Sequence, residues 1–141
     1  MPPNLIHYAT GAEYRHHYLT YYCQAQIYTF DGIRVHFPQQ QFDDAFFESA
    51  DRRARDKSVF SWRRAKRIAW IGAALADANA ELYAGWDRDK GRANRKRRVI
   101  VVYSDYVVII QISASRSWAT FITAYVADPA TLQKIRGMPR W

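Results

Sequence analysis

The feature of the sequence that most constrains the fold is residues 97–128, where three runs rich in Val, Ile, Tyr, Phe and Thr follow one another. The runs contain no Pro and no Gly, and short polar breaks separate them. This composition is typical of β-strands, and short connections favour antiparallel pairing of successive strands. We therefore predict an antiparallel meander with helices on one face and hydroxyl side chains on the other.

Upstream of the meander, residues 18–37 read as a β-hairpin. The run YLTYYCQAQIYTF is aromatic and β-branched, Asp31-Gly32 is a two-residue turn signal, and IRVHF alternates as far as Pro38. Residues 1–17 show no clear period, so we expect an arm or a short irregular helix there.

Helical spacing of apolar residues occurs in residues 39–50 and, more regularly, in residues 60–76, where Ser61 is a plausible N-cap. ELYAGW at residues 81–86 predicts a strand. We expect a long basic loop at residues 87–98 and a short final helix at residues 129–136.

Together these elements predict an α+β fold. We expect an antiparallel β-sheet of about four strands in the C-terminal part with helices packed on one face, plus an N-terminal β-hairpin. A chain of 141 residues suits a single domain, 1–141. Its parts are the arm and hairpin (1–37), the helices (39–76), the sheet (81–127) and the final helix (129–136).

The chain is strongly basic, with a net charge of +8 and a pI near 9.8. Residues 51–67 and 87–98 together carry +11, and the rest of the chain carries −3. Clustered cations favour a polyanionic partner such as RNA, because phosphate binding needs many cations on one face. The alternative interpretation is a solvated charged surface that keeps the protein soluble.

Several classes of protein are disfavoured by the sequence. It contains no Cys/His cluster, Walker loop, GxGxxG, HExxH or GxSxG motif, so we expect no metal and no cofactor. No apolar stretch approaches the roughly 18 residues of a membrane helix, so we expect no membrane partner. The single cysteine, Cys23, and the lack of a secretory signal pattern favour a cytoplasmic location.

RNA can be cleaved without a metal, because its 2′-hydroxyl is the nucleophile and the enzyme supplies a base, cations and an acid. Arg64 lies on the apolar stripe of its helix, where it either snorkels at the edge of the core or points into a site. His36 has a pKa suited to proton transfer, although it is equally an ordinary strand residue with one hydrogen-bonded ring nitrogen. On the last strand we expect Phe121, Thr123 and Tyr125 to share one face, with Thr123 the favoured hydroxyl and Tyr125 a second polar group or a ring for a base.

The order of segments FSWRRAKRIAWIGAAL, AELYAGW, a basic loop, RVIVVYSDYVVIIQIS and ATFITAYV resembles the barnase–EndoU–colicin–RelE superfamily, in particular its phage and mobile-element branch. The resemblance covers roughly residues 58–127. It implies a metal-independent ribonuclease of toxin or effector type, restrained by an acidic antitoxin or immunity protein. By position, Arg64 matches the helix cation of that superfamily and Thr123 the hydroxyl of the last strand, whereas His36 lies outside the matched region.

The leading hypothesis is therefore a metal-independent endoribonuclease. Arg64 would stabilise the phosphorane, His36 would transfer a proton and Thr123 would orient the scissile phosphate. Flanking phosphates would be held by basic side chains of the two charged stretches, namely Lys66, Arg67, Arg95, Lys96, Arg97 and Arg98. The alternatives are a nucleic-acid-binding module without catalysis and a phage or mobile-element protein-interaction domain whose basic surface meets an acidic partner.

Overall fold

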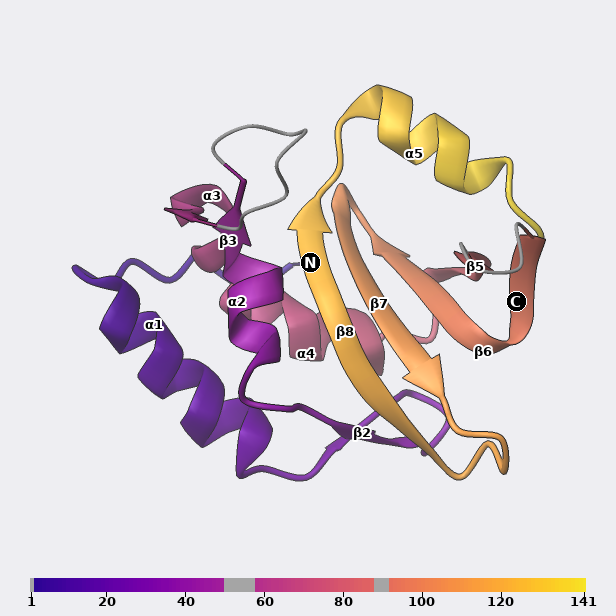
Figure 1. The fold of residues 1–141 in the computed structure, drawn as a ribbon, viewed down its shortest axis with the longest axis horizontal. Coiled ribbons are helices and arrows are strands. Elements are labelled where there is room, and N and C mark those ends of the chain that lie inside the picture. The colour runs from indigo at the N-terminus through magenta and orange to yellow at the C-terminus, as the bar shows by residue number, and fades with distance from the viewer. Residues whose placement is uncertain (1, 50–57, 88–91) are drawn as a thin grey trace.

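The computed structural model describes residues 2–49, 58–87 and 92–141, with the backbone alone for residues 86, 87 and 92–97 (Figure 1). Its main sheet has six strands in the order β1-β2-β8-β7-β6-β5. The strands are β1 (Ile27–Tyr28), β2 (Arg34–His36), β5 (Glu81–Asp87), β6 (Arg92–Tyr103), β7 (Tyr106–Ile112) and β8 (Trp118–Val126). β2 runs parallel to β8, and the other neighbours are antiparallel. The predicted α+β class is confirmed, and the N-terminal hairpin joins the meander in one sheet.

Helices cover the two faces of this sheet unequally. The larger core lies between one face and α1 (Gly11–Tyr18), the π-helical turn η1 (Leu19–Cys23), α2 (Gln41–Phe46), α3 (Trp62–Ala65) and α4 (Ile68–Ala76). A smaller cluster lies on the other face, where α5 (Pro129–Arg136) packs Leu132 and Ile135 over the meander. We call the first face the inner face and the second the outer face. A separate two-stranded sheet joins β3 (Phe47–Glu48) to β4 (Val59–Phe60).

Within residues 1–17, where an arm or a short irregular helix was expected, α1 begins, and residues 19–23 form η1 where a strand was expected. Tyr14, Tyr18 and Tyr22 are all buried, and their spacing of four residues places them on one helical face toward the core. Tyr22 fixes this segment to α4, because its hydroxyl donates to the Ile68 carbonyl (2.5 Å) and accepts from the Gly72 amide (3.1 Å). The predicted hairpin is thereby reduced to β1 and β2. Its turn contains Asp31-Gly32, with Gly32 at a φ of 88°, but it is longer than the two-residue turn expected, because the Thr29 amide donates to the Ile33 carbonyl (2.8 Å) across it.

The two predicted helices are also shorter than expected. The helix predicted for residues 39–50 ends at Phe46, and residues 47–48 form β3 instead. The helix predicted for residues 60–76 is interrupted at Lys66 and Arg67, which separate α3 from α4. Ser61 does cap α3, since its side chain accepts a hydrogen bond from the Arg64 amide (3.3 Å).

The basic stretch expected to be a loop is largely a strand. β6 begins at Arg92 and pairs with β5 through Asp87, so only residues 88–91 of the expected loop lie outside the described residues. The β5–β6 ladder shifts register between Ala84 and Gly85. The stem of Arg98 lies against Gly85, where an added Cβ would come within 2.4 Å of the Arg98 Cγ atom.

A bulge in β8 changes which side chains face outward. Ile109 of β7 pairs with Thr123, and the next residue, Ile110, pairs with Phe121, so Ile122 is the extra residue. Phe121 consequently belongs to the inner core, whereas Tyr125 packs on the outer cluster. The prediction that Phe121, Thr123 and Tyr125 share a face is wrong, because the bulge reverses the alternation between Phe121 and Thr123.

The last residues of the chain lie along the edge of β5. The Ala84 amide donates to the Pro139 carbonyl (2.8 Å), and the Trp141 amide donates to the Leu82 carbonyl (3.1 Å). Tyr83 and Arg140 form an antiparallel bridge between these two hydrogen bonds. The tail therefore pairs with β5 as a short additional strand.

Candidate nucleic-acid site

Arg64 is held at the start of α3 by two residues from different elements. Its Nε lies 3.4 Å from the Oε1 atom of Glu48, which β3 presents beside the helix. The buried Ser61 donates its hydroxyl to the same oxygen (3.2 Å) while it caps the helix. Arg64 and Ser61 both contact Oε1, and the Glu48 side chain is 47% exposed, so its carboxylate is accessible from solvent.

The guanidinium of Arg64 also reaches the last strand. Its Cζ lies 5.9 Å from the centre of the Tyr125 ring, which is a cation–π distance. Burial raises the pKa of Tyr125, and the charge of Arg64 opposes part of that rise. The phenol is therefore protonated at neutral pH and has a cation beside it that would stabilise its ionised form.

Thr123 lies on the same side of β8 as Tyr125, because no bulge interrupts the alternation between them. Its hydroxyl donates to the Asp44 carbonyl of α2 (3.2 Å), so it is oriented by the helix that flanks this edge of β8. Arg64, Thr123 and Tyr125 are thus placed at one end of β8, with Glu48 as a fourth member. We call these four residues the Arg64 cluster.

His36 lies at the other end of the same strand. It pairs with Thr120 across β2 and β8, and Thr120 pairs with Gln111 of β7. Tyr125 pairs with Val107, four residues from Gln111 along β7, which corresponds to about 13 Å of strand. His36 is exposed on the outer face, but it does not join the Arg64 cluster.

The predicted phosphate-binding residues are divided between two regions. Arg67 lies between α3 and α4, where its Nη1 donates to the Arg63 carbonyl of α3 (2.8 Å) and its Cζ lies 5.3 Å from the centre of the Trp70 ring of α4. Lys66 is half-buried at the break between α3 and α4. Arg98 lies on the outer face of β6, in the ladder with Gln111. The side chains of Arg95, Lys96 and Arg97 lie outside the described residues.

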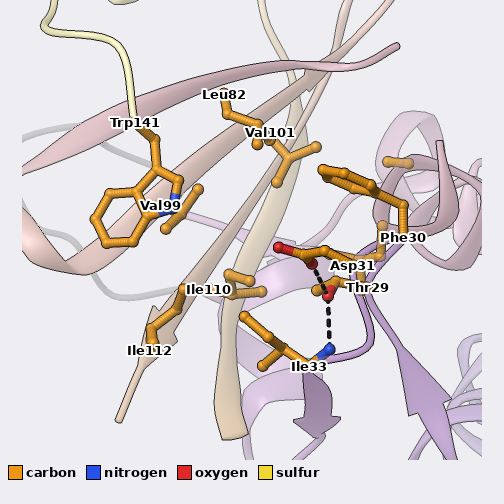
Figure 2. Close-up of a pocket in the computed structure, with 12 residues that line it drawn as sticks. Thr29, Phe30, Asp31, Ile33, Leu82, Val99, Val101, Ile110, Ile112 and Trp141 are labelled. Carbon is orange, nitrogen blue, oxygen red and sulfur yellow. Dashed lines mark hydrogen bonds between the residues drawn. The ribbon is translucent and has the colours of Figure 1, made fainter. Parts of the chain in front are cut away.

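A pocket on the inner face has a different character (Figure 2). It encloses about 370 Å³, including open solvent at its mouth, between the hairpin turn, the end of α4 and the sheet. Apart from Thr29 and Asp31, its walls are apolar and include Phe30 and Trp141, and none of the described residues that line it is a cation. This pocket therefore does not suit a phosphate, unlike the opposite side of the sheet.

Sequence reasoning did not identify Glu48, which lies in a segment expected to be helical. The position of Glu48 depends on its pairing with Val59, and no local sequence pattern predicts that pairing. Ser61 was identified as a cap, but its bond to Glu48 follows from the same pairing.

Comparisons with known proteins do not identify this site. No family model matches the chain, and searches of curated proteins and of solved structures return no match. Within the described ranges, His, Cys, Asp and Glu side chains do not gather in a group of three or more suited to a metal. No helix in the described part of the chain has the length and apolar character needed to span a membrane.

Proposed function

We propose that this protein is a metal-independent endoribonuclease that cleaves RNA by attack of the 2′-hydroxyl, with the Arg64 cluster as its reaction centre. The observation that carries the proposal is the convergence of Arg64, Glu48 and Tyr125 from three elements at one end of β8. These side chains supply the cation, base and acid that the reaction needs.

In the proposed reaction, Glu48 accepts the proton of the 2′-hydroxyl as that oxygen attacks phosphorus. The bond from phosphorus to the 5′-oxygen breaks, and Tyr125 donates its proton to the departing oxygen. The products are a 2′,3′-cyclic phosphate and a 5′-hydroxyl. Arg64 faces the extra negative charge at phosphorus and stabilises the tyrosinate. Thr123 orients the phosphate once its hydroxyl turns from the Asp44 carbonyl to a phosphate oxygen. Water then takes the proton from Glu48 and returns one to Tyr125, which restores both groups.

Glu48 replaces His36 as the base in this proposal because of distance. A general base must lie within hydrogen-bond reach of the proton it removes, at about 2.6–3.2 Å or through one water. His36 is separated from the level of Tyr125 by about 13 Å of strand. We therefore assign His36 to binding of the same RNA farther along β8.

The test is cleavage of an RNA oligonucleotide in excess chelator, with mass spectrometry of the products. We expect Arg64→Ala to reduce the rate by about 100- to 1,000-fold, the effect of losing a group that stabilises the transition state. Glu48→Gln and Tyr125→Phe should each reduce it by about 100- to 10,000-fold.

Arg15→Ala is a matched control for Arg64→Ala. Arg15 also pairs with a carboxylate, Asp43 (2.7 Å), and also lies over an aromatic ring, Phe42 (4.4 Å). It belongs to α1 and to none of the proposed machinery, so its loss should leave the rate within about two-fold. Wild-type levels of cleavage by both Arg64→Ala and Glu48→Gln, or products without a cyclic phosphate, would contradict the proposal.

We propose that the cleavage is toxic and that an acidic protein neutralises it, as the sequence resemblance implies. Expression of the wild-type chain should arrest growth, and expression of Arg64→Ala at the same level should not. Growth arrest that persists in both Arg64→Ala and Glu48→Gln would point to a cause other than cleavage.

RNA binding without cleavage is a second candidate function, favoured by the cations and exposed ring around His36 at the other end of β8. It predicts salt-sensitive binding and intact RNA after long incubation with the wild-type protein.

A further inference from the structure

The half of the outer face that α5 leaves uncovered carries a row of polar side chains across four strands. His36 of β2 pairs with Thr120 of β8, Thr120 with Gln111 of β7, and Gln111 with Arg98 of β6. The adjacent row, toward the Arg64 cluster, contains Ile100 and Ile109, which pack against α5. The outward side chains are thus apolar where α5 packs on the sheet and polar in the next row, which α5 does not cover.

Next to this polar row lies an exposed tryptophan with an arginine beside it. Trp118 is 45% exposed and pairs with Arg34, which is also exposed. Ala119, which follows Trp118, and Val35, which follows Arg34, both lie in the inner core. Side chains alternate along a strand, so Trp118 and Arg34 point outward. The rings of His36 and Trp118 meet edge to face, with centroids 5.7 Å apart and planes at 82°.

The charge of this region suits a nucleic acid. The outward positions of β2, β7 and β8 hold no acidic residue. Arg34 and His36 flank the indole from β2, and Arg98 lies in the polar row two strands away. Arg34 and His36 also line a hollow of about 530 Å³, open solvent included, between β2 and the end of η1. The region therefore offers an aromatic face for a base, cations for phosphates and adjacent volume.

We infer that this region binds an unpaired nucleobase stacked on Trp118, so that the substrate is single-stranded RNA. The inference deepens the proposed function and rests on it for the identity of the nucleic acid. An exposed ring can stack only on a base whose own face is free, which a duplex does not provide along its length. The bound base lies about 20 Å along β8 from Tyr125, because Trp118 is two residues beyond Thr120, so it belongs to a nucleotide several positions from the cleaved bond.

The experiment measures binding separately from cleavage. The probes are a fluorescein-labelled 2′-O-methyl RNA single strand, which lacks the nucleophilic hydroxyl, and the duplex of the same sequence. We expect Trp118→Ala to weaken single-strand binding by about 5- to 150-fold, since base stacking on an aromatic ring contributes about 1–3 kcal/mol. Trp118→Phe should recover part of the loss, and duplex binding should change by less than about two-fold.

Tyr21→Ala is the matched control. Tyr21 is 59% exposed and also lies beside a histidine, His17, with ring centroids 4.5 Å apart, but it belongs to η1. It should leave single-strand binding unchanged. Thermal unfolding should give similar Tm values for Trp118→Ala and the wild type, because the ring is exposed.

The outcomes separate this inference from the proposed function. Loss of single-strand binding in Trp118→Ala supports the inference even if the wild type cleaves no RNA. Unchanged binding in Trp118→Ala, or equal loss for the single strand and the duplex, overturns it even if RNA is cleaved. Displacement of the RNA single strand by polyglutamate at an equal concentration of negative charges would also overturn the inference. The face would then recognise acidic chains in general.

Discussion

Ser61 makes two hydrogen bonds that serve different purposes. Its oxygen accepts from the Arg64 amide and so caps α3, and its hydroxyl donates to the carboxylate of Glu48. The first bond stabilises a helix of four residues, and the second orients the proposed base. One buried side chain therefore couples the start of the helix to the geometry of the reaction centre.

Ser61→Ala should consequently affect both stability and cleavage. Losing an N-cap destabilises a protein by about 0.5–2 kcal/mol, which urea unfolding can measure. RNA cleavage should also fall, because Glu48 loses a partner that holds it. The kcat should fall more than the KM rises, since the substrate-binding face is unchanged.

Asp128→Ala provides the comparison for this prediction. Asp128 caps α5 by accepting from the Thr131 amide (2.7 Å), far from Glu48 in the sequence and on another element. This variant should lose a similar free energy of unfolding and keep its cleavage rate. Equal losses of cleavage in the two variants would show that Ser61 acts through stability alone.

Individual site residues differ in how far the sequence predicts them. Arg64 could be singled out because a charge on an apolar helical stripe is locally visible, and the structure places it beside Glu48 and Tyr125. The faces of Phe121 and Thr123 could not be predicted, because the bulge at Ile122 arises from pairing with β7. The role of Glu48 likewise depends on a contact between two segments distant in the chain.

At the scale of elements, Gly85 allows β5 and the side chain of Arg98 to meet closely. An added Cβ would lie 2.4 Å from Cγ, 2.9 Å from Cδ and 3.0 Å from Cβ of Arg98. The Cβ atom of Arg98 is fixed to the backbone, and Cγ and Cδ can move away only if the side chain changes rotamer or the strand shifts. Gly85→Ala should therefore destabilise the protein by about 1–3 kcal/mol in urea unfolding.

Gly72→Ala is the natural control for this element. Gly72 lies within α4, and an added Cβ would contact only the Tyr22 ring and hydroxyl, at 3.5 Å or more. Alanine in a helix interior is favoured over glycine by about 0.5–1 kcal/mol, so this variant should be slightly more stable. Combining Gly85→Ala with Arg98→Ala should restore most of the lost stability, and failure to do so would exclude the proposed clash.

The sequence predicted the elements whose signals are local. The strands β7 and β8 follow from β-branched residues with polar breaks, and α5 follows from Asp128, Pro129 and the apolar spacing after them. The segment that becomes η1 was assigned to a strand on its aromatic composition, although the spacing of Tyr14, Tyr18 and Tyr22 indicated a helix. There, burial in the core overrides the β-propensity of single residues.

At the scale of the whole molecule, buried tyrosines make stability depend on alkaline pH. Burial raises the pKa of Tyr22 to about 12, despite the opposing hydrogen bond from Gly72, and burial also raises the pKa values of Tyr18 and Tyr106. In the unfolded chain the same groups ionise near pH 10, at about their reference pKa. The folded state therefore favours their protonated forms.

A raised folded pKa contributes stability that is fully present below the unfolded pKa and is lost as pH rises. The free energy of unfolding should therefore decline from about pH 10 toward pH 12, by up to about 1.4 kcal/mol per pH unit for each such tyrosine. Urea unfolding at several pH values measures the decline. Tyr22→Phe should be less stable at pH 8, because it loses two hydrogen bonds, and should show a shallower decline. An unchanged slope would refute the assignment of Tyr22.

The tail at residues 139–141 has a consequence for assembly. An unpaired strand edge is a template on which a second polypeptide can add a strand. Along Leu82–Ala84 that template is already paired within the chain, because the Pro139 carbonyl accepts from the Ala84 amide and the Trp141 amide donates to the Leu82 carbonyl. The opposite border of the sheet is β1, only two residues long. Strand addition along Leu82–Ala84 would therefore have to displace the tail, and β1 offers only a short border, which favours recognition through exposed side chains.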